Sequence, residues 1–313
     1  MKYFDLHCDT AYEMYNRKQT LGTNALSVSL DGFDVYERKA EVFAVWSENT
    51  KSPGDVYGDF FNIFDYLKEE IGKNADRAVL CTDAPTLCAD DSRLKIIPAV
   101  EGSRLIEKDI FRLEILRELG VRVLTLAWGG LCPACGAYDT DVGLTDFGYQ
   151  VVEMCEKLGI ILDVSHLSEK GFWDLANVAK KPFIASHSNA QTVCNHPRNL
   201  SDTQLRTVIS HGGIAGVNLV GKHLSKTFAD CPDPDPEAVL ETVVKHILHF
   251  MEKGSGKNIC LGCDLDGTEP LAGLEKVSDI GKIADYMKKH GADEMLTEDV
   301  FYNNAFAFFA KNL

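Results

Sequence analysis

The chain has 313 residues, of which 45% are hydrophobic and 9% aromatic, so it can bury a large core and is not intrinsically disordered. Its 32 Lys and Arg and 47 Asp and Glu residues give a formal net charge of −15. Nucleic acid is therefore excluded as the main partner, because basic surfaces bind phosphate backbones. At roughly 150 residues per domain the length allows two domains, but one α/β barrel commonly uses this length.

The N-terminal segment has charges at Lys2, Asp5 and Asp9, whereas a secretory signal needs an uninterrupted apolar stretch. The sequence contains no run of about 18 uncharged apolar residues that would predict a membrane-spanning helix. We therefore expect a cytoplasmic protein with no membrane partner.

Short apolar or β-branched runs alternate with longer helical patterns along the chain. The predicted strands are residues 3–7, 41–46, 95–100, 122–127, 160–165, 182–186, 214–219 and 258–263. The predicted helices are residues 54–71, 104–119, 147–158, 168–179, 201–210 and 236–253. This alternation indicates a parallel sheet, and eight strands predict a closed (β/α)₈ TIM-like barrel of the metal-dependent hydrolase type. An open doubly wound sheet is the alternative, and the apolar segment 301–309 predicts a docked core helix.

Four of the ten cysteines form two C-x-x-C pairs, Cys132 with Cys135 and Cys260 with Cys263. Cys260 and Cys263 lie in a strand-like run, where residues three apart point to opposite faces and do not easily share a metal. Cys132 and Cys135 lie in a Gly-rich loop and could bind a metal or form a reversible disulfide. Free, reduced thiols are the favoured interpretation for both pairs.

The active site of such a barrel lies at the C-terminal ends of its strands. Five predicted strands end in residues suited to metal binding or proton transfer, namely His7 with Asp9, Glu101, Asp163 with His166, Ser186 to Ser188 around His187, and Asp264 with Asp266. His and Asp two apart on a strand share a face and can reach one ion. Two imidazoles from adjacent strands can hold a second ion, and a carboxylate can bridge metals about 3.5–4 Å apart.

Imidazole and carboxylate ligands without thiolate favour zinc, with manganese or another divalent ion as alternatives. Each residue alone has a structural interpretation: a histidine can be a hydrogen-bonded core residue, and Asp9 can cap the first helix. Their coincidence at one rim favours a metal site. Because the ligands extend from His7 to Asp264, we expect one barrel domain over residues 1–313. His246 and His249 form an alternative surface metal pair, while His211, His223 and His290 are expected to be ordinary surface or loop residues.

These residues lie in motifs that resemble the membrane dipeptidase (renal dipeptidase, peptidase M19) family. The matching motifs are His7-x-Asp9, PAVEGS around Glu101, DVSHLS around His166, ASHSNA around His187, HPRNLSD with Arg198, and LGCDLDG with Asp264. They occur in the family's order over residues 1 to about 270, with a weaker match at Asn304. The motifs resemble the Trp-bearing bacterial members, because Leu126-Ala127-Trp128 stands where animal members have an LTH histidine. No catalytic role is transferred to Trp128.

The resemblance implies a barrel that hydrolyses dipeptides, frequently with a D-residue at the C-terminal position. It implies two zinc ions, with His7 and Asp9 on one, His166 and His187 on the other, and Glu101 bridging them. It further implies Arg198 as the clamp for the substrate's C-terminal carboxylate. It suggests a homodimer, which no pattern in the sequence tests. The unusual loop at 129–136 leaves the choice of dipeptide open.

In this hypothesis the two ions provide a hydroxide at neutral pH, and Asp264 accepts its proton and passes it to the leaving amine. Asp266 is the competing acid/base candidate. A bidentate grip by Arg198 would restrict substrates to short peptides with a free C-terminus, whereas the structural alternative for Arg198 is a surface ion pair. The rival functions are another metal-dependent amidohydrolase, acting on cyclic amides or N-acyl amino acids, and a non-enzymatic thiol or metal-handling protein.

Overall fold

The computed structural model describes residues 1–46, 51–229, 231, 233–254 and 256–313. In these residues eight parallel strands form one sheet with the order β6-β5-β4-β2-β1-β8-β7, and β3 pairs with β4 outside this path. The strands are β1 (Tyr3–Cys8), β2 (Lys39–Val45), β3 (Ala78–Leu80), β4 (Leu94–Glu101), β5 (Val123–Thr125), β6 (Ile161–Asp163), β7 (Ala215–Val217) and β8 (Ile259–Leu261).

Residues 184 and 185 join the two ends of this strand order. Ile184 pairs in parallel with Asp163 of β6, and Ala185 pairs with Ala215 of β7. Two backbone hydrogen bonds connect each side. The predicted strand 182–186 is thus present as a short bridging segment, and it closes the ring. The expected TIM-like barrel is confirmed, and the open doubly wound sheet is wrong.

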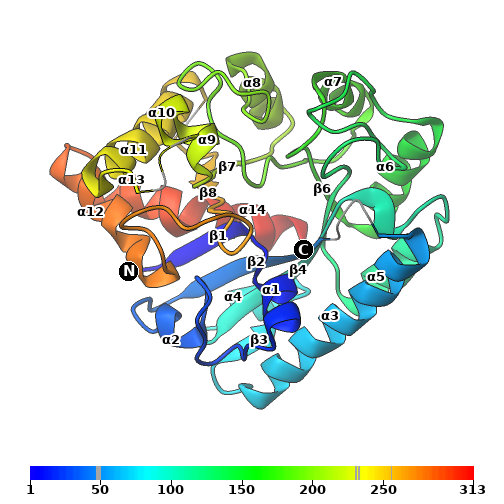
Figure 1. Ribbon diagram of the computed structural model, residues 1–313, viewed down its shortest axis with the longest axis horizontal. Coiled ribbons are helices and arrows are strands. Elements are labelled where there is room, and N and C mark those ends of the chain that lie inside the picture. The colour runs from blue at the N-terminus through cyan, green and yellow to red at the C-terminus, as the bar shows by residue number, and fades with distance from the viewer. Residues whose placement is uncertain (47–50, 230, 232, 255) are drawn as a thin grey trace.

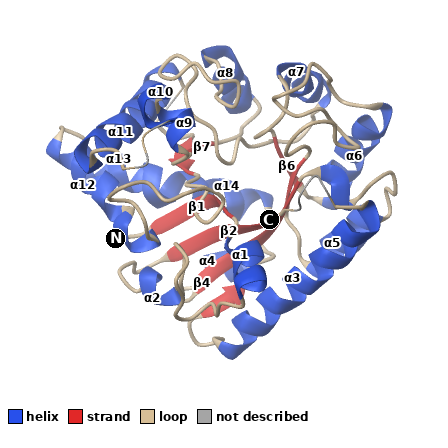
Figure 2. Cartoon of the chain, viewed as in Figure 1, coloured by secondary structure: helices blue, strands red, loops and turns tan. Residues whose placement is uncertain are grey.

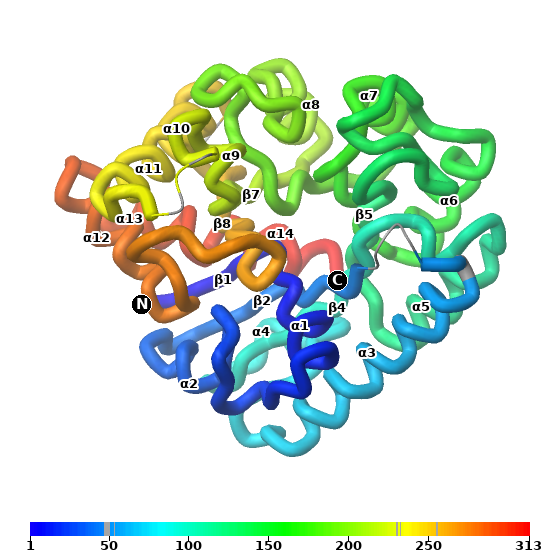
Figure 3. Tube along the Cα trace, in the orientation of Figure 1, coloured from blue at the N-terminus to red at the C-terminus, as the bar shows by residue number. Residues whose placement is uncertain are grey.

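Helices surround the strands, and the chain follows the ring in sequence order (Figures 1, 2 and 3). The longer ones are α1 (Thr10–Arg17), α3 (Pro53–Lys73), α5 (Arg112–Leu119), α6 (Asp146–Leu158), α7 (Glu169–Val178), α8 (Asp202–Ser210), α11 (Pro236–Lys253), α12 (Gly281–Lys289) and α14 (Asn304–Asn312). Shorter ones are α2 (Leu30–Phe33), α4 (Ala84–Cys88), α9 (Gly221–Leu224), α10 (Lys226–Ala229) and α13 (Glu294–Glu298). Within the described part of the chain, every helix is too short or too polar to cross a bilayer.

Local sequence signals explain where several helices begin. The Ser168 hydroxyl accepts a hydrogen bond from the Gly171 N–H at the start of α7, and Ser201 forms a capping box with Gln204 at the start of α8, as expected for N-cap residues. The predicted helix 104–119 is interrupted, because Glu107 has a positive φ of 47° that an α-helix cannot contain. Only its second part forms α5.

The inside of the barrel is apolar at the N-terminal ends of the strands, and α14 covers that end. Phe4 of β1 and Phe309 of α14 are fully buried in this core, with ring centroids 5.2 Å apart. The predicted docked helix at the C-terminal end of the sequence is therefore confirmed. The end covered by α14 is thus apolar, and buried polar groups lie at the opposite end of the barrel.

The two C-x-x-C pairs have different surroundings. Cys260 belongs to the core inside the barrel, whereas Cys263 belongs to the core between strands and helices. These thiols lie on opposite faces, as predicted. Cys132 and Cys135 are buried in a loop where the Cys132 N–H donates to the Cys135 carbonyl at 3.1 Å. Burial raises the pKa of both thiols, that of Cys135 to about 12.

Candidate active site

Glu101, at the end of β4, lies at the centre of the polar rim. Its Oε1 atom is 2.9 Å from His166 Nε2, 3.4 Å from His187 Nε2 and 3.7 Å from His7 Nε2. His166 follows β6, His187 follows the bridging residues 184 and 185, and His7 is the second-to-last residue of β1. The structure thus brings together side chains that the sequence analysis selected on four separate segments.

His7 also contacts two carboxylates on its other side. Its Nε2 atom is 3.7 Å from Asp9 Oδ1 and 3.9 Å from Asp264 Oδ1. Two sets of three side chains could each hold a metal ion, because the ligand atoms within each set lie within 4.8 Å of one another. One set is His7, Glu101 and His187, and the other is His7, Asp9 and Asp264. Asp9 occupies the N-cap position of α1, as the alternative interpretation expected, but its side chain makes no capping hydrogen bond and lies against His7 instead.

A chain of hydrogen bonds orients the His187 ring. The Ser186 hydroxyl donates to Asp163 Oδ2 at 2.6 Å, and the same carboxylate oxygen accepts from Thr125 at 2.7 Å. Because the Ser186 hydroxyl proton is donated to Asp163, the Ser186 oxygen accepts a hydrogen bond from His187 Nδ1 at 2.7 Å. His187 therefore presents a lone pair at Nε2, which faces Glu101 and lies 2.9 Å from His166 Nε2. Such partners behind the ring are typical of metal-binding histidines.

Several buried atoms at the centre have no hydrogen-bond partner: His7 Nε2, Asp9 Oδ1 and Glu101 Oε1. Buried polar atoms in this state are costly, at about 1–3 kcal/mol each and more when charged. A divalent cation between them would satisfy all three. The donor set of imidazole nitrogens and carboxylate oxygens is that of zinc and related divalent ions. The residues therefore fit a metal centre.

The pKa shifts show how crowded the negative charges are. Burial raises the pKa of Asp264 to about 8 and that of Asp9 to about 6, with neighbouring carboxylates adding to both shifts. Burial opposes a charge on His7, but Glu101, Asp9 and Asp264 together raise its pKa to about 10. Burial lowers the pKa of His187 well below 6.5, so its lone pair stays available. Carboxylates so close together favour a cation among them.

Arg198 lies on the wall of a cavity of about 340 Å³ that Glu101 and Asp264 also line; we call this the catalytic cavity. The Arg198 side chain is only 4% exposed, and its Nη2 donates to the His187 carbonyl at 3.3 Å. Its Nε has no partner. The structural alternative of a surface ion pair is wrong, because the guanidinium is buried beside the rim.

The two aspartates after β8 have separate environments. Asp264 lines the catalytic cavity, whereas Asp266 accepts hydrogen bonds from the Thr10 hydroxyl at 2.7 Å and the Ser27 N–H at 2.6 Å. Both aspartates lie beyond β8, which ends at Leu261, and both have positive φ, so their side chains do not follow the alternation of a strand. A side chain at Gly267 would collide with Asp9 and Asp264, so glycine is needed beside these carboxylates.

Sequence analysis missed two residues at the site. His223 is buried, lines the catalytic cavity and has an unpartnered Nε2, so its interpretation as an ordinary surface or loop residue is wrong. It follows the strand predicted at 214–219, and the rule that selected the other rim residues could have found it. Tyr138 also lines this cavity, but its loop has no periodic pattern. Trp128 lines the cavity and stacks on Trp46 with centroids 4.9 Å apart.

His246 is fully buried, so the alternative of a surface metal pair with His249 is wrong. Its Nδ1 accepts from the Ala190 N–H at 3.0 Å, and its Nε2 then donates to the Leu224 carbonyl at 2.9 Å. Both ring nitrogens have protein partners. His246 thus supports the segment that follows His187 and has no lone pair for a metal.

With this geometry, similarities to other proteins can be interpreted. The family model for membrane dipeptidases (peptidase family M19) matches residues 1–311. The uncharacterized protein in the pqqA 5′ region of Klebsiella pneumoniae is 31% identical over 264 residues, 80% of this chain and 95% of that protein. An uncharacterized dipeptidase of Schizosaccharomyces pombe is 29% identical over 248 residues, 73% of this chain but 58% of that protein. The chain thus spans little more than half of the yeast relative.

Among solved structures, a metallo peptidase from Rhodobacter sphaeroides has the same fold, with a TM-score of 0.90 at 24% sequence identity. The similarity covers 100% of this chain and 99% of that one. The Rhodobacter protein was solved with a phosphinate mimic of the dipeptide L-Ala-D-Ala.

Proposed function

This chain belongs to the membrane dipeptidase family, peptidase family M19, and is a metallo-dipeptidase; from that premise we propose that it hydrolyses dipeptides with a free C-terminal carboxylate, using two zinc ions. The observation that carries the proposal is the set of unpartnered buried atoms on His7, Asp9 and Glu101, next to a buried arginine. One barrel domain over residues 1–313, a cytoplasmic location and a homodimer stay predictions from the sequence.

His7 and Asp9 would hold one ion and His166 and His187 the other, with Glu101 shared between them. When bound, the two ions would supply a nucleophilic water at neutral pH and polarise the scissile carbonyl. The chain's own contribution begins with the Asp163–Ser186–His187 hydrogen bonds, which fix the His187 ring before substrate arrives.

Asp264 is the proposed acid/base residue. Its Oδ1 faces His7 from the wall of the catalytic cavity, where it can accept a proton from the attacking water and deliver it to the leaving amine. Asp266 is less suited, because both of its oxygens already accept hydrogen bonds from Thr10 and the chain at Ser27.

Arg198 would bind the substrate's carboxylate in the catalytic cavity, since a guanidinium pairs with a carboxylate through two parallel hydrogen bonds. Dipeptides with a C-terminal D-residue are included in the proposal. The dipeptide mimic bound by the Rhodobacter relative, which carries D-Ala, supports this part.

A panel of L-L, L-D and Gly-containing dipeptides, with their C-terminal amides, tests the proposal on zinc-loaded protein. We expect close to two metals per chain, activity that chelators abolish, and no cleavage of the amides. Arg198→Met should raise KM about 10- to 100-fold, because a charged hydrogen bond contributes about 1.5–3 kcal/mol. Arg206→Met, on an exposed position of α8, is the matched control. Cleavage of cyclic amides or N-acyl amino acids in preference to dipeptides would instead support the amidohydrolase alternative.

A further inference from the structure

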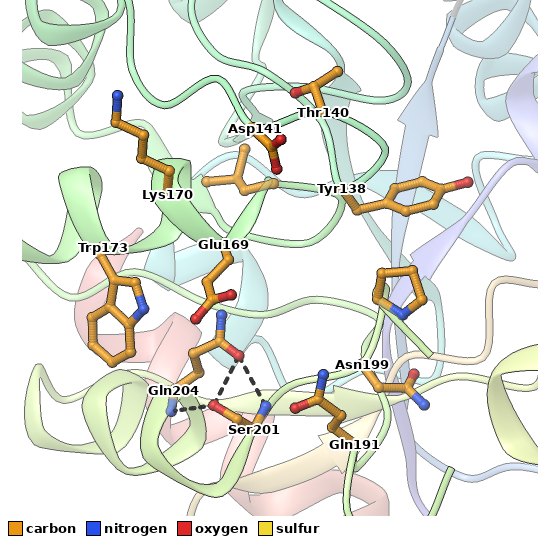
Figure 4. A pocket seen from close by; sticks show the side chains of 12 residues that line it. Tyr138, Thr140, Asp141, Glu169, Lys170, Trp173, Gln191, Asn199, Ser201 and Gln204 are labelled. Carbon is orange, nitrogen blue, oxygen red and sulfur yellow. Dashed lines mark hydrogen bonds between the residues drawn. The ribbon is translucent and has the colours of Figure 1, made fainter. Parts of the chain in front are cut away.

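A second cavity, of about 520 Å³, shares Tyr138 with the catalytic cavity; we call it the adjoining cavity. Figure 4 shows the side chains that line it. At two places in the chain, one residue lines the catalytic cavity and the next residue lines the adjoining cavity. His166 and Arg198 line the catalytic cavity, whereas Leu167 and Asn199 line the adjoining one. Tyr138 lines both. These segments therefore form a wall between the two cavities, and Tyr138 belongs to this wall and borders both cavities.

The wall is held firmly except at the Tyr138 ring. Arg198 donates to the His187 carbonyl, and the Asn199 amide donates to the Cys194 and His223 carbonyls, both at 2.8 Å. The Tyr138 backbone is fixed as well, because its N–H donates to the His166 carbonyl at 2.8 Å. Its ring, in contrast, is half-buried and packs against Arg198 and the rings of His166 and His196.

The ring occupies the space next to the proposed carboxylate-binding group. Its centroid is 5.7 Å from Arg198 Cζ and 6.2 Å from the His166 ring centroid. In Figure 4 the Tyr138 hydroxyl points away from Lys170 and Trp173, which line the far side of the adjoining cavity. The ring thus stands between Arg198 and the adjoining cavity.

We propose that Tyr138 determines substrate length: its ring closes the catalytic cavity beyond Arg198 and keeps a third residue out of the adjoining cavity. This inference rests on the proposed dipeptidase function. Gln191 and Gln204 line the adjoining cavity with amides that suit a peptide group, and Lys170 adds an ammonium that suits a carboxylate. The carboxylates of Asp141 and Glu169 line it as well. Removing the ring would join the two cavities.

The test compares kcat/KM for Gly-Gly and Gly-Gly-Gly in zinc-loaded wild type, Tyr138→Ala and Tyr138→Phe. We expect the tripeptide-to-dipeptide ratio to rise about tenfold or more in Tyr138→Ala, since admitting an excluded group changes specificity by about 10- to 200-fold. Tyr138→Phe keeps the ring and should keep the wild-type ratio. In the Tyr138→Ala background, Lys170→Met should lower the gain for Gly-Gly-Gly and spare its C-terminal amide.

A dipeptidase whose ratio stays unchanged in Tyr138→Ala overturns the inference alone, as does equal loss of both substrates. A rise in Tyr138→Phe equal to that in Tyr138→Ala would assign the effect to the hydroxyl and also overturn it. A wild type that cleaves no dipeptide overturns the proposed function itself. Metal content and thermal unfolding establish that each variant is folded, and Tyr138→Leu replaces the alanine variant if that one does not fold.

Discussion

The two ends of the barrel are built from the same strands and differ in chemistry. On β1, Phe4 is enclosed by apolar neighbours near α14, whereas His7 lies against the Glu101 carboxylate and the His187 ring at the rim. On β4, Ile97 belongs to the apolar interior and Glu101 to the rim. The interior offsets the cost of the rim, where polar atoms are buried without partners. Stability and function therefore depend on different residues of one strand.

Backbone conformation shows the same contrast. Of the five described non-glycine residues with positive φ, His166, Asp264 and Asp266 lie after strands at the rim. Such conformations cost about 1–3 kcal/mol each and tend to occur at functional sites. At the closed end the strands begin with regular parallel pairing, such as Tyr3 opposite Lys39. Three of these five conformations thus lie at the end that carries the chemistry, and the other two, at Lys18 and Glu107, lie outside the strands.

Replacing Glu101 tests the rim most severely. Glu101→Gln should lower kcat/KM on the order of a thousandfold and reduce the bound metal, because its carboxylate faces three imidazoles. Metal analysis and dipeptide kinetics measure both effects, with the exposed Glu153→Gln as control. Intact metal content and activity in Glu101→Gln would remove its proposed bridging role.

Phe309→Ala tests the opposite end. Emptying this fully buried position should lower the free energy of unfolding by about 3–5 kcal/mol, while the folded fraction keeps its metal content. Phe306→Ala, on the half-buried face of the same helix, should cost less. Denaturant unfolding gives the comparison. Loss of metal without loss of stability would contradict the separation of the two ends.

His246 distinguishes a satisfied buried histidine from the rim histidines. Burial lowers its pKa to about 4, below the ordinary 6.5, so the fold favours the neutral ring. Its stabilising contribution is complete above pH 6.5 and is lost as pH falls from 6.5 to 4. At about 1.4 kcal/mol per pKa unit the loss reaches about 3 kcal/mol. Unfolding of metal-free protein at several pH values should show this slope, and His246→Gln should flatten it; an equal slope in both would contradict the assignment.

Ser186→Ala is expected to act more mildly, because it removes a hydrogen bond that orients the proposed ligand His187 and leaves His187 itself in place. Losing the hydrogen bond to His187 Nδ1 should weaken metal affinity about 10- to 100-fold. Ser188→Ala is the matched control, since Ser188 is equally buried beside His187 but contacts the Ser165 hydroxyl at 3.4 Å. Metal titration followed by competition with a chelator compares the two, and equal affinities would remove the positioning role.

The smallest effect is expected from Cys132→Ser and Cys135→Ser. Among the described residues, neither thiol belongs to a group of possible metal ligands, so metal content should stay at the wild-type value. Metal loss in these variants, with His7→Ala and His187→Ala retaining metal, would instead favour a thiol-based metal-handling protein.

The sequence was sufficient to predict all eight strands of the ring and the polar residues that meet at the rim, because buried runs ending in His, Asp or Glu are visible without a structure. The 182–186 segment was found although it makes only single bridges. In contrast, β3 has three residues outside the ring and no periodicity to detect. Tyr138 reaches the cavity from an irregular loop, so its position depends on tertiary packing. His223 follows a predicted strand and was open to the same rule as the other rim residues.

The contact between Phe4 and Phe309 also affects how the protein folds during synthesis. The first strand emerges from the ribosome long before the helix that covers its apolar end. At about 5–20 residues per second, the apolar N-terminal end of the strands stays uncovered by α14 for on the order of tens of seconds during synthesis. His7 is likewise synthesised well before Asp264, which lies 3.9 Å from it in the folded protein. Chaperone protection of the growing chain and late metal acquisition are the expected consequences of joining the first strand to the last helix.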